Sequence, residues 1–162
     1  MMRLGLGILC AGLLMAPLPT AQAAEPDAAG FVRITPSQLK WVDIPGGHGA
    51  KFAAVLGNQG GTGMYVVRVH FPAHVMDTPH FHPNDRYVTV LEGTWYAGTG
   101  PVFDPSKAVP MGPGGVMFHP GGGVHWDGSA GDDGATVQII GMGPGATTPV
   151  DPQVANWVDV KR

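Results

Sequence analysis

Histidines are concentrated in one stretch of the chain. Seven occur among 162 residues, and six of them lie between positions 70 and 125. His80 and His82 are separated by one residue, and positions i and i+2 of a β-strand point to the same face, so both imidazoles can converge on one point inside a barrel. Neutral imidazole suits Fe, Mn, Ni, Cu or Zn. The pair is thus compatible with a divalent transition-metal site, and also with two structural histidines.

Short apolar segments separated by turn residues predict an all-β protein. The 26 glycines and 16 prolines are interspersed along the chain rather than gathered in one block, as in domains with many tight turns. Segments rich in β-branched and aromatic residues predict strands, and the clearest are 51–56, 64–71, 85–92, 93–98, 116–119 and 135–142. A turn leading into a short strand is expected at 37–42, and residues 154–160 are expected either to add a closing strand or to lie over the barrel mouth. No segment has a helical period longer than about two turns.

A second pattern follows the histidine pair. Gly114, Pro120, Gly122 and His125 have the spacing G-x5-P-x-G-x2-H. Together with His80, His82 and Gly93, this pattern resembles the two conserved motifs of the cupin superfamily, G-x5-H-x-H-x3,4-E-x6-G and G-x5-P-x-G-x2-H-x3-N. The resemblance covers about residues 64–142 and implies a single-domain jelly-roll β-barrel. It also implies that His125 joins His80 and His82 as a metal ligand, because a glycine-rich turn would direct it back toward the pair.

Three motif positions depart from the family pattern. His74 replaces the first glycine, Arg86 the glutamate ligand, and Ser129 the final asparagine. The change at Arg86 matters most, because a guanidinium cannot coordinate a cation and repels one. Three alternatives remain open: a three-histidine site in which Arg86 holds a substrate carboxylate, a shifted register that brings Asp85 or Tyr87 into the ligand position, or a barrel without metal that binds an anionic ligand.

The resemblance also carries expectations about function. We expect a metal-dependent enzyme, of oxygenase type, acting on a small acidic organic molecule, with Arg86 and Tyr87 orienting the substrate. The alternative is a non-catalytic cupin that binds or senses a small ligand or metal. His119, beside Pro120, could line the pocket, whereas His74 is expected as a surface turn residue. Cupins often pair, so the resemblance allows a homodimer.

The first residues predict an export signal. Arg3 precedes an apolar run from Leu4 to about Leu18, and Ala21-Gln22-Ala23 has the small-x-small pattern of a cleavage site. Residues 1–24 are therefore expected to be a signal peptide and residues 25–162 the barrel domain, periplasmic or secreted and free of the membrane. Cys10 is the only cysteine and lies in the predicted signal, so no disulfide is expected.

Charge excludes one class of partner. The formal net charge is −3, and no basic cluster occurs anywhere in the sequence. Nucleic-acid binding depends on a concentration of positive charge on one surface. We therefore expect a small molecule as the partner, and no nucleic acid.

Overall fold

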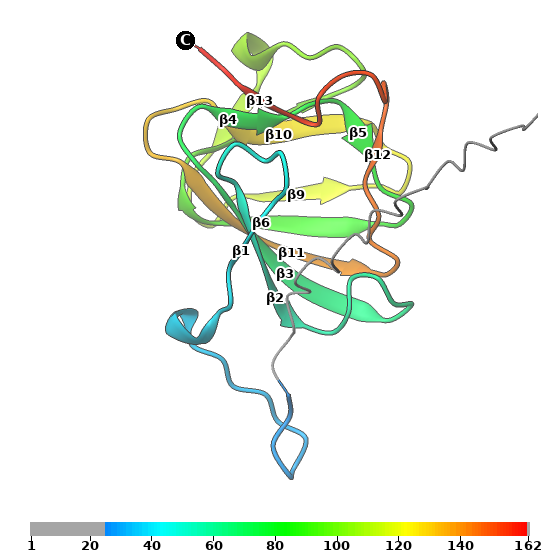
Figure 1. Cartoon of the computed structure of the whole chain (residues 1–162). Coiled ribbons are helices and arrows are strands. Elements are labelled where there is room, and N and C mark those ends of the chain that lie inside the picture. Colours follow the sequence, from blue (N-terminus) through cyan, green and yellow to red (C-terminus); the bar gives the residue numbers. More distant parts are fainter. Residues whose placement is uncertain (1–24, 162) are drawn as a thin grey trace, which may run out of the picture.

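Two antiparallel sheets form the body of the computed structural model, which describes residues 25–161 (Figure 1). The first sheet has six strands in the order β1-β2-β3-β11-β6-β9. Their bounds are Val42–Asp43 for β1, Lys51–Leu56 for β2, Met64–Phe71 for β3, Arg86–Gly93 for β6, Val116–His119 for β9 and Ala135–Met142 for β11.

The second sheet is built around β10. Strands β12, β5, β10, β4 and β13 follow one another in that order, while β7 pairs with β10 and with β8. The bounds are Val75–Asp77 for β4, His80–Phe81 for β5, Trp95–Thr99 for β7, Val109–Met111 for β8, His125–Ser129 for β10, Thr148–Pro149 for β12 and Trp157–Asp159 for β13. Two single-turn 3₁₀ helices complete the described elements, η1 at Pro36–Gln38 and η2 at Pro105–Lys107.

Side-chain alternation explains the inside of the barrel. In β3, Tyr65, Val67, Val69 and Phe71 are buried, while the residues between them are partly exposed, as the two-residue period of a strand requires. These side chains pack with inward residues of β6, β7 and β11 in one hydrophobic cluster. The predicted all-β barrel is confirmed, and β2, β3, β9 and β11 begin and end at the predicted residues.

Some predicted elements need correction. Strands β4, β8 and β12 have two or three residues each and were not expected, since such short segments carry no period. The large aromatic residues divide between the interior and the outer face of the barrel. Trp95 and Trp126 are buried, but Tyr87 and Phe118 lie on the outer face, with ring centroids 5.1 Å apart.

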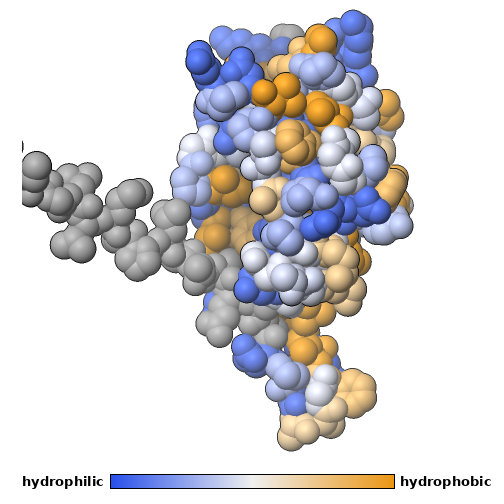
Figure 2. Space-filling model, turned by 90° about the vertical axis from the view of Figure 1, so that its right-hand side faces the viewer, coloured by the Kyte–Doolittle hydropathy of each residue, from blue (hydrophilic) through white to orange (hydrophobic). Residues whose placement is uncertain are grey.

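The N-terminal part of the described chain lies outside the barrel. Ile34, Leu39 and Trp41 pack on Ala53 and Val55 of β2, and the residues before them project from the lower end of the molecule (Figures 1 and 2). On the face shown in Figure 2, hydrophobic and hydrophilic side chains are interspersed. The predicted signal peptide, residues 1–24, lies outside the described residues. Within residues 25–161, no helix has the length and apolar character needed to cross a bilayer.

Candidate metal centre

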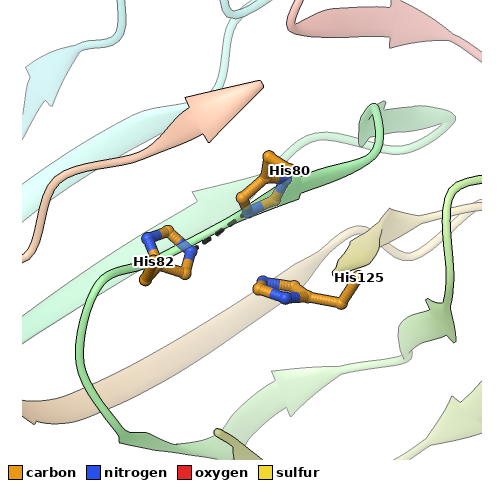
Figure 3. Close-up of side chains that lie close together, drawn as sticks. All are labelled: His80, His82 and His125. Carbon is orange, nitrogen blue, oxygen red and sulfur yellow. Dashed lines mark hydrogen bonds between the residues drawn. The ribbon is translucent and has the colours of Figure 1, made fainter. Parts of the chain in front are cut away.

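The three predicted histidines meet inside the barrel (Figure 3). His80 lies in β5, His82 follows it directly, and His125 begins β10, where it pairs in register with His80. The ring centroid of His80 lies 4.9 Å from that of His82 and 4.4 Å from that of His125. All three residues are buried. The strand pairing therefore brings together side chains that lie 45 positions apart in the sequence.

The backbone fixes which nitrogen of each ring faces the centre. All three Nδ1 atoms lie at hydrogen-bond distance from a backbone carbonyl oxygen. The pairs are His80 with Thr78 at 2.8 Å, His82 with Ala146 at 2.8 Å and His125 with Gly123 at 2.9 Å. Because a carbonyl oxygen only accepts, each Nδ1 must carry the proton. Each neutral ring thus presents the lone pair of its Nε2.

Two of these lone pairs face each other. The Nε2 atoms of His80 and His82 are 3.1 Å apart. Burial lowers the pKa of His80 to about 4 and that of His82 to about 2, and the positive charge of Arg86 further lowers the latter. Both rings are therefore neutral near pH 7, and no proton lies between the two nitrogens. A cation between them would relieve this repulsion, so the donor set fits a metal ion.

Arg86 points into the same cluster. Its side chain is buried, its Nε donates to Nδ1 of His119 at 3.1 Å, and its Nη2 donates to Nε2 of His125 at 3.2 Å. The Tyr65 hydroxyl lies close enough to interact with the same guanidinium. Arg86 forms no ion pair with any carboxylate of residues 25–161, although the charges of Asp127 and Asp77 act on it. The guanidinium and a metal ion therefore compete for one lone pair, that of His125.

The shifted-register alternative is wrong. Asp85 is exposed and accepts a hydrogen bond from the backbone N–H of Gly121 at 2.8 Å. Tyr87 is 55 % exposed on the opposite face of β6 from Arg86, so it does not reach the cavity. Without a bulge at this point, alternation along β6 places only Arg86 inside. We therefore assign Tyr87 no role in orienting a substrate.

The two remaining histidines of interest lie in different environments. His119 is buried, and its ring centroid lies 3.9 Å from that of His125. Because its Nδ1 accepts from Arg86, its proton must be on Nε2, which has no hydrogen-bond partner within residues 25–161. His74 lies in a surface turn, as expected, with its Nε2 2.9 Å from Asp132. Its φ of 62° is the left-handed conformation that suits the glycine it replaces.

Two acidic residues that the sequence analysis did not single out complete the site. Asp127 lies two residues after His125 on β10, and Asp77 lies on the adjacent β4. Asp77 Oδ1 accepts from the backbone N–H of Asp127 at 2.7 Å, and Asp127 Oδ1 accepts from Trp95 Nε1 at 3.0 Å. Burial and the neighbouring Asp127 hold the pKa of Asp77 well above its usual range. The signal that could have found Asp127 is its i+2 spacing from His125.

The cluster opens on a cavity of about 480 Å³. His80, His82, Arg86, Asp77 and Asp127 line its polar part. Apolar side chains from both sheets make up most of the remaining wall, namely Ile44, Phe52, Val67, Val69, Phe71, Ile139 and Trp157. This volume suits a small organic molecule, with one polar end at the histidines and an apolar remainder.

Fold and site together define a small double-sheet β-barrel with an internal histidine cluster. No known protein-family model and no curated protein matches the sequence, whereas many solved structures match the fold. An RmlC-like cupin from Shewanella frigidimarina aligns over 67 % of this chain and 87 % of its own, with 18 % identity and a TM-score of 0.54. The chain therefore has the cupin fold.

Two other structures with this fold are enzymes by name. The polyketide cyclase RemF from Streptomyces resistomycificus aligns over 78 % of this chain and 89 % of its own, with 18 % identity and a TM-score of 0.64. The DMSP lyase DddQ from Ruegeria pomeroyi aligns over 73 % of this chain and 64 % of its own, with 18 % identity and a TM-score of 0.58. Identities this low establish the fold and leave the reaction open.

Proposed function

We propose that the chain binds one divalent transition metal through His80, His82 and His125. The observation that carries this proposal is the pair of Nε2 lone pairs of His80 and His82, 3.1 Å apart, with both Nδ1 protons committed to backbone carbonyls. Hydrogen bonds of this kind, made by the ring nitrogen that faces away from the metal, fix the tautomer and orientation of metal-ligating histidines. Imidazole ligands suit Fe, Mn, Ni, Cu and Zn.

We further propose that the protein is a metal-dependent enzyme acting on a small anionic molecule. A bound metal would supply Lewis acidity, and with three histidine ligands it would keep open positions for substrate. The cavity of about 480 Å³ holds the substrate against apolar walls. Arg86, buried at the polar end without an ion-pair partner among the described residues, would hold the substrate carboxylate. A cyclase and a lyase on the same fold support an enzymatic role, and we favour an oxygenase-type reaction.

One observation favours a second function. Nη2 of Arg86 already donates to Nε2 of His125, so the guanidinium takes the place at this ligand that a metal would need. A barrel that uses Arg86 and the histidines only to bind or sense a small anion would have this arrangement. The two functions differ in metal content, which is therefore the first quantity to measure.

The test is elemental analysis of the purified protein beside two single-histidine variants. About one equivalent of a transition metal is expected in the wild type, and its loss is expected in His82→Ala. His70→Ala is the matched control, because His70 lies on the outer side of β3 and bonds Thr136 at 3.1 Å. Absence of metal from the wild type, even after loading with each metal in turn, would overturn the metal proposal and leave the anion-binding barrel.

We also propose that the domain acts outside the cytoplasm, on the strength of the predicted signal in residues 1–24. Fractionation of expressing cells followed by N-terminal sequencing tests this proposal. A mature chain beginning at Ala24 or Glu25 in the periplasm or medium is expected. An uncleaved chain in the cytoplasm would contradict it.

A further inference from the structure

The site lacks the carboxylate that its first motif would normally supply. Arg86 occupies that position, so the proposed metal would have three neutral ligands and no anionic one. A carboxylate from another strand could take over this role. Of the described carboxylates, those of Asp77 and Asp127 form one candidate group with His80, and Asp127 forms another with His119 and His125. These groups border the three histidines, and within each group the donor atoms lie within 4.8 Å of one another.

Asp127 has an oxygen without a partner. Its side chain is only 5 % exposed, Oδ1 is held by Trp95 Nε1 at 3.0 Å, and Oδ2 has no hydrogen bond to any described residue. That free oxygen lies 3.9 Å from Nε2 of His125, the nitrogen that faces the centre of the cluster. A buried carboxylate oxygen without a partner costs free energy unless a cation or a donor occupies the space beside it.

The two neighbouring candidates are held away from the centre. Asp77 Oδ1 accepts from the backbone N–H of Asp127 and lies 3.6 Å from Nδ1 of His80, the nitrogen that faces the backbone. His119 is also close, but its Nδ1 lone pair accepts from Arg86 and its Nε2 carries a proton, so it offers no lone pair to a metal. Asp127 is thus the residue with an unused donor atom on the inner side of the cluster.

We infer that Asp127 is the fourth protein ligand, so that the centre is three histidines and one aspartate. The ligand has moved from β6 to β10, where strand alternation places Asp127 on the same face as His125. This inference rests on the proposed metal site and adds one residue to it. The carboxylate also supplies negative charge beside Arg86, which offsets part of the repulsion between the guanidinium and a cation.

The experiment is titration of the metal-free protein with Co²⁺, followed by visible absorption and by competition with a chelator. Asp127→Asn is expected to bind Co²⁺ at least ten-fold more weakly than the wild type, with a changed d–d spectrum because one oxygen ligand is lost. The amide oxygen of asparagine can still accept from Trp95, which preserves the packing. Asp43→Asn is the matched control, since Asp43 lines the same cavity but pairs with Lys51 at 3.5 Å near the surface.

An unchanged affinity and spectrum in Asp127→Asn would overturn the inference while leaving the three-histidine site intact. Failure of the wild type itself to bind Co²⁺ would overturn both proposals. If the variant does not fold, a crystal structure of the wild type with Zn²⁺ decides the question. A distance of about 2.0–2.2 Å between Asp127 Oδ2 and the metal is expected, and an Asp127 turned away from the metal would refute the assignment.

Discussion

Replacement of Arg86 by methionine should tighten metal binding. In the structure the guanidinium donates from Nη2 to Nε2 of His125 at 3.2 Å, so a metal must break this bond before it can use that nitrogen. Methionine has a similar length, remains apolar in the buried position and donates no hydrogen bond. The substitution therefore frees the third ligand and removes a positive charge from the site.

The magnitude follows from two contributions. A hydrogen bond to a charged group contributes about 1.5–3 kcal/mol. A unit charge and a divalent ion about 4 Å apart repel by about 8 kcal/mol at the effective dielectric constant of a protein surface. The carboxylates of Asp77 and Asp127 act on Arg86 in the opposite sense, and so offset much of this repulsion. We expect a net tightening of about 10- to 100-fold, which corresponds to about 1.4–2.8 kcal/mol.

The assay is chelator competition with Zn²⁺ at pH 7.5 on three proteins. These are the wild type, Arg86→Met and the matched control Arg68→Met, which removes a guanidinium bonded to Gln138 on the outer side of the sheet. Only Arg86→Met should bind more tightly, and it should also lose binding of small carboxylates. An equal or weaker Zn²⁺ affinity would refute the competition, and would mean that Arg86 is needed to hold His125 in place.

Three further predictions concern other parts of the barrel. Acid should destabilise the metal-free protein, because burial lowers the pKa of His80 to about 4 and protonation of this residue therefore favours the unfolded chain. The contribution of His80 to the free energy of unfolding is lost as the pH falls from about 6.5 toward 4, by roughly 1 kcal/mol between pH 6.5 and 5.5. Equal free energies of urea unfolding at pH 6.5 and 5.5 would contradict this. Tyr87→Ala should leave the Zn²⁺ affinity within about two-fold of wild type, because the Tyr87 ring lies on the outer face of the barrel. A ten-fold loss of Zn²⁺ affinity in the same competition assay would mean that Tyr87 contributes to the metal site. Gly98→Ala should destabilise the fold by about 1–3 kcal/mol, because a methyl group there would overlap the Trp126 ring. Gly112→Ala is the control, since a methyl group at that position meets no atom within 4 Å. Equal free energies of unfolding for the two variants would show that the ring can move.

The sequence was informative where a side chain's role depends on spacing. The motif positions placed His80, His82 and His125 together, and the structure brings them to one point because β5 and β10 pair in register. The glycine position occupied by His74 retains a φ of 62°, so the motif predicts the backbone even where the residue differs.

The sequence analysis missed two acidic residues of the site and misplaced Tyr87, and each error has a physical reason. Asp127 follows His125 at the spacing that puts both on one face, but an isolated aspartate in the motif spacer has no pattern to mark it. Asp77 ends a strand of three residues, too short for any period to show. Tyr87 was misplaced because one step along a strand reverses the direction of the side chain, and neighbouring positions cannot both face the barrel interior.

The charges inside the barrel limit what it can hold. Three neutral imidazoles, one guanidinium and one divalent ion give +3, and the formal charge of Asp127 reduces this to +2 while Asp77 is protonated, the form that its raised pKa favours. Without metal, the same groups sum to zero. Buried net charge is costly unless it is paired, so the loaded site should favour an anionic ligand. Metal loading adds charge that attracts an anion, so metal and anionic substrate should bind cooperatively.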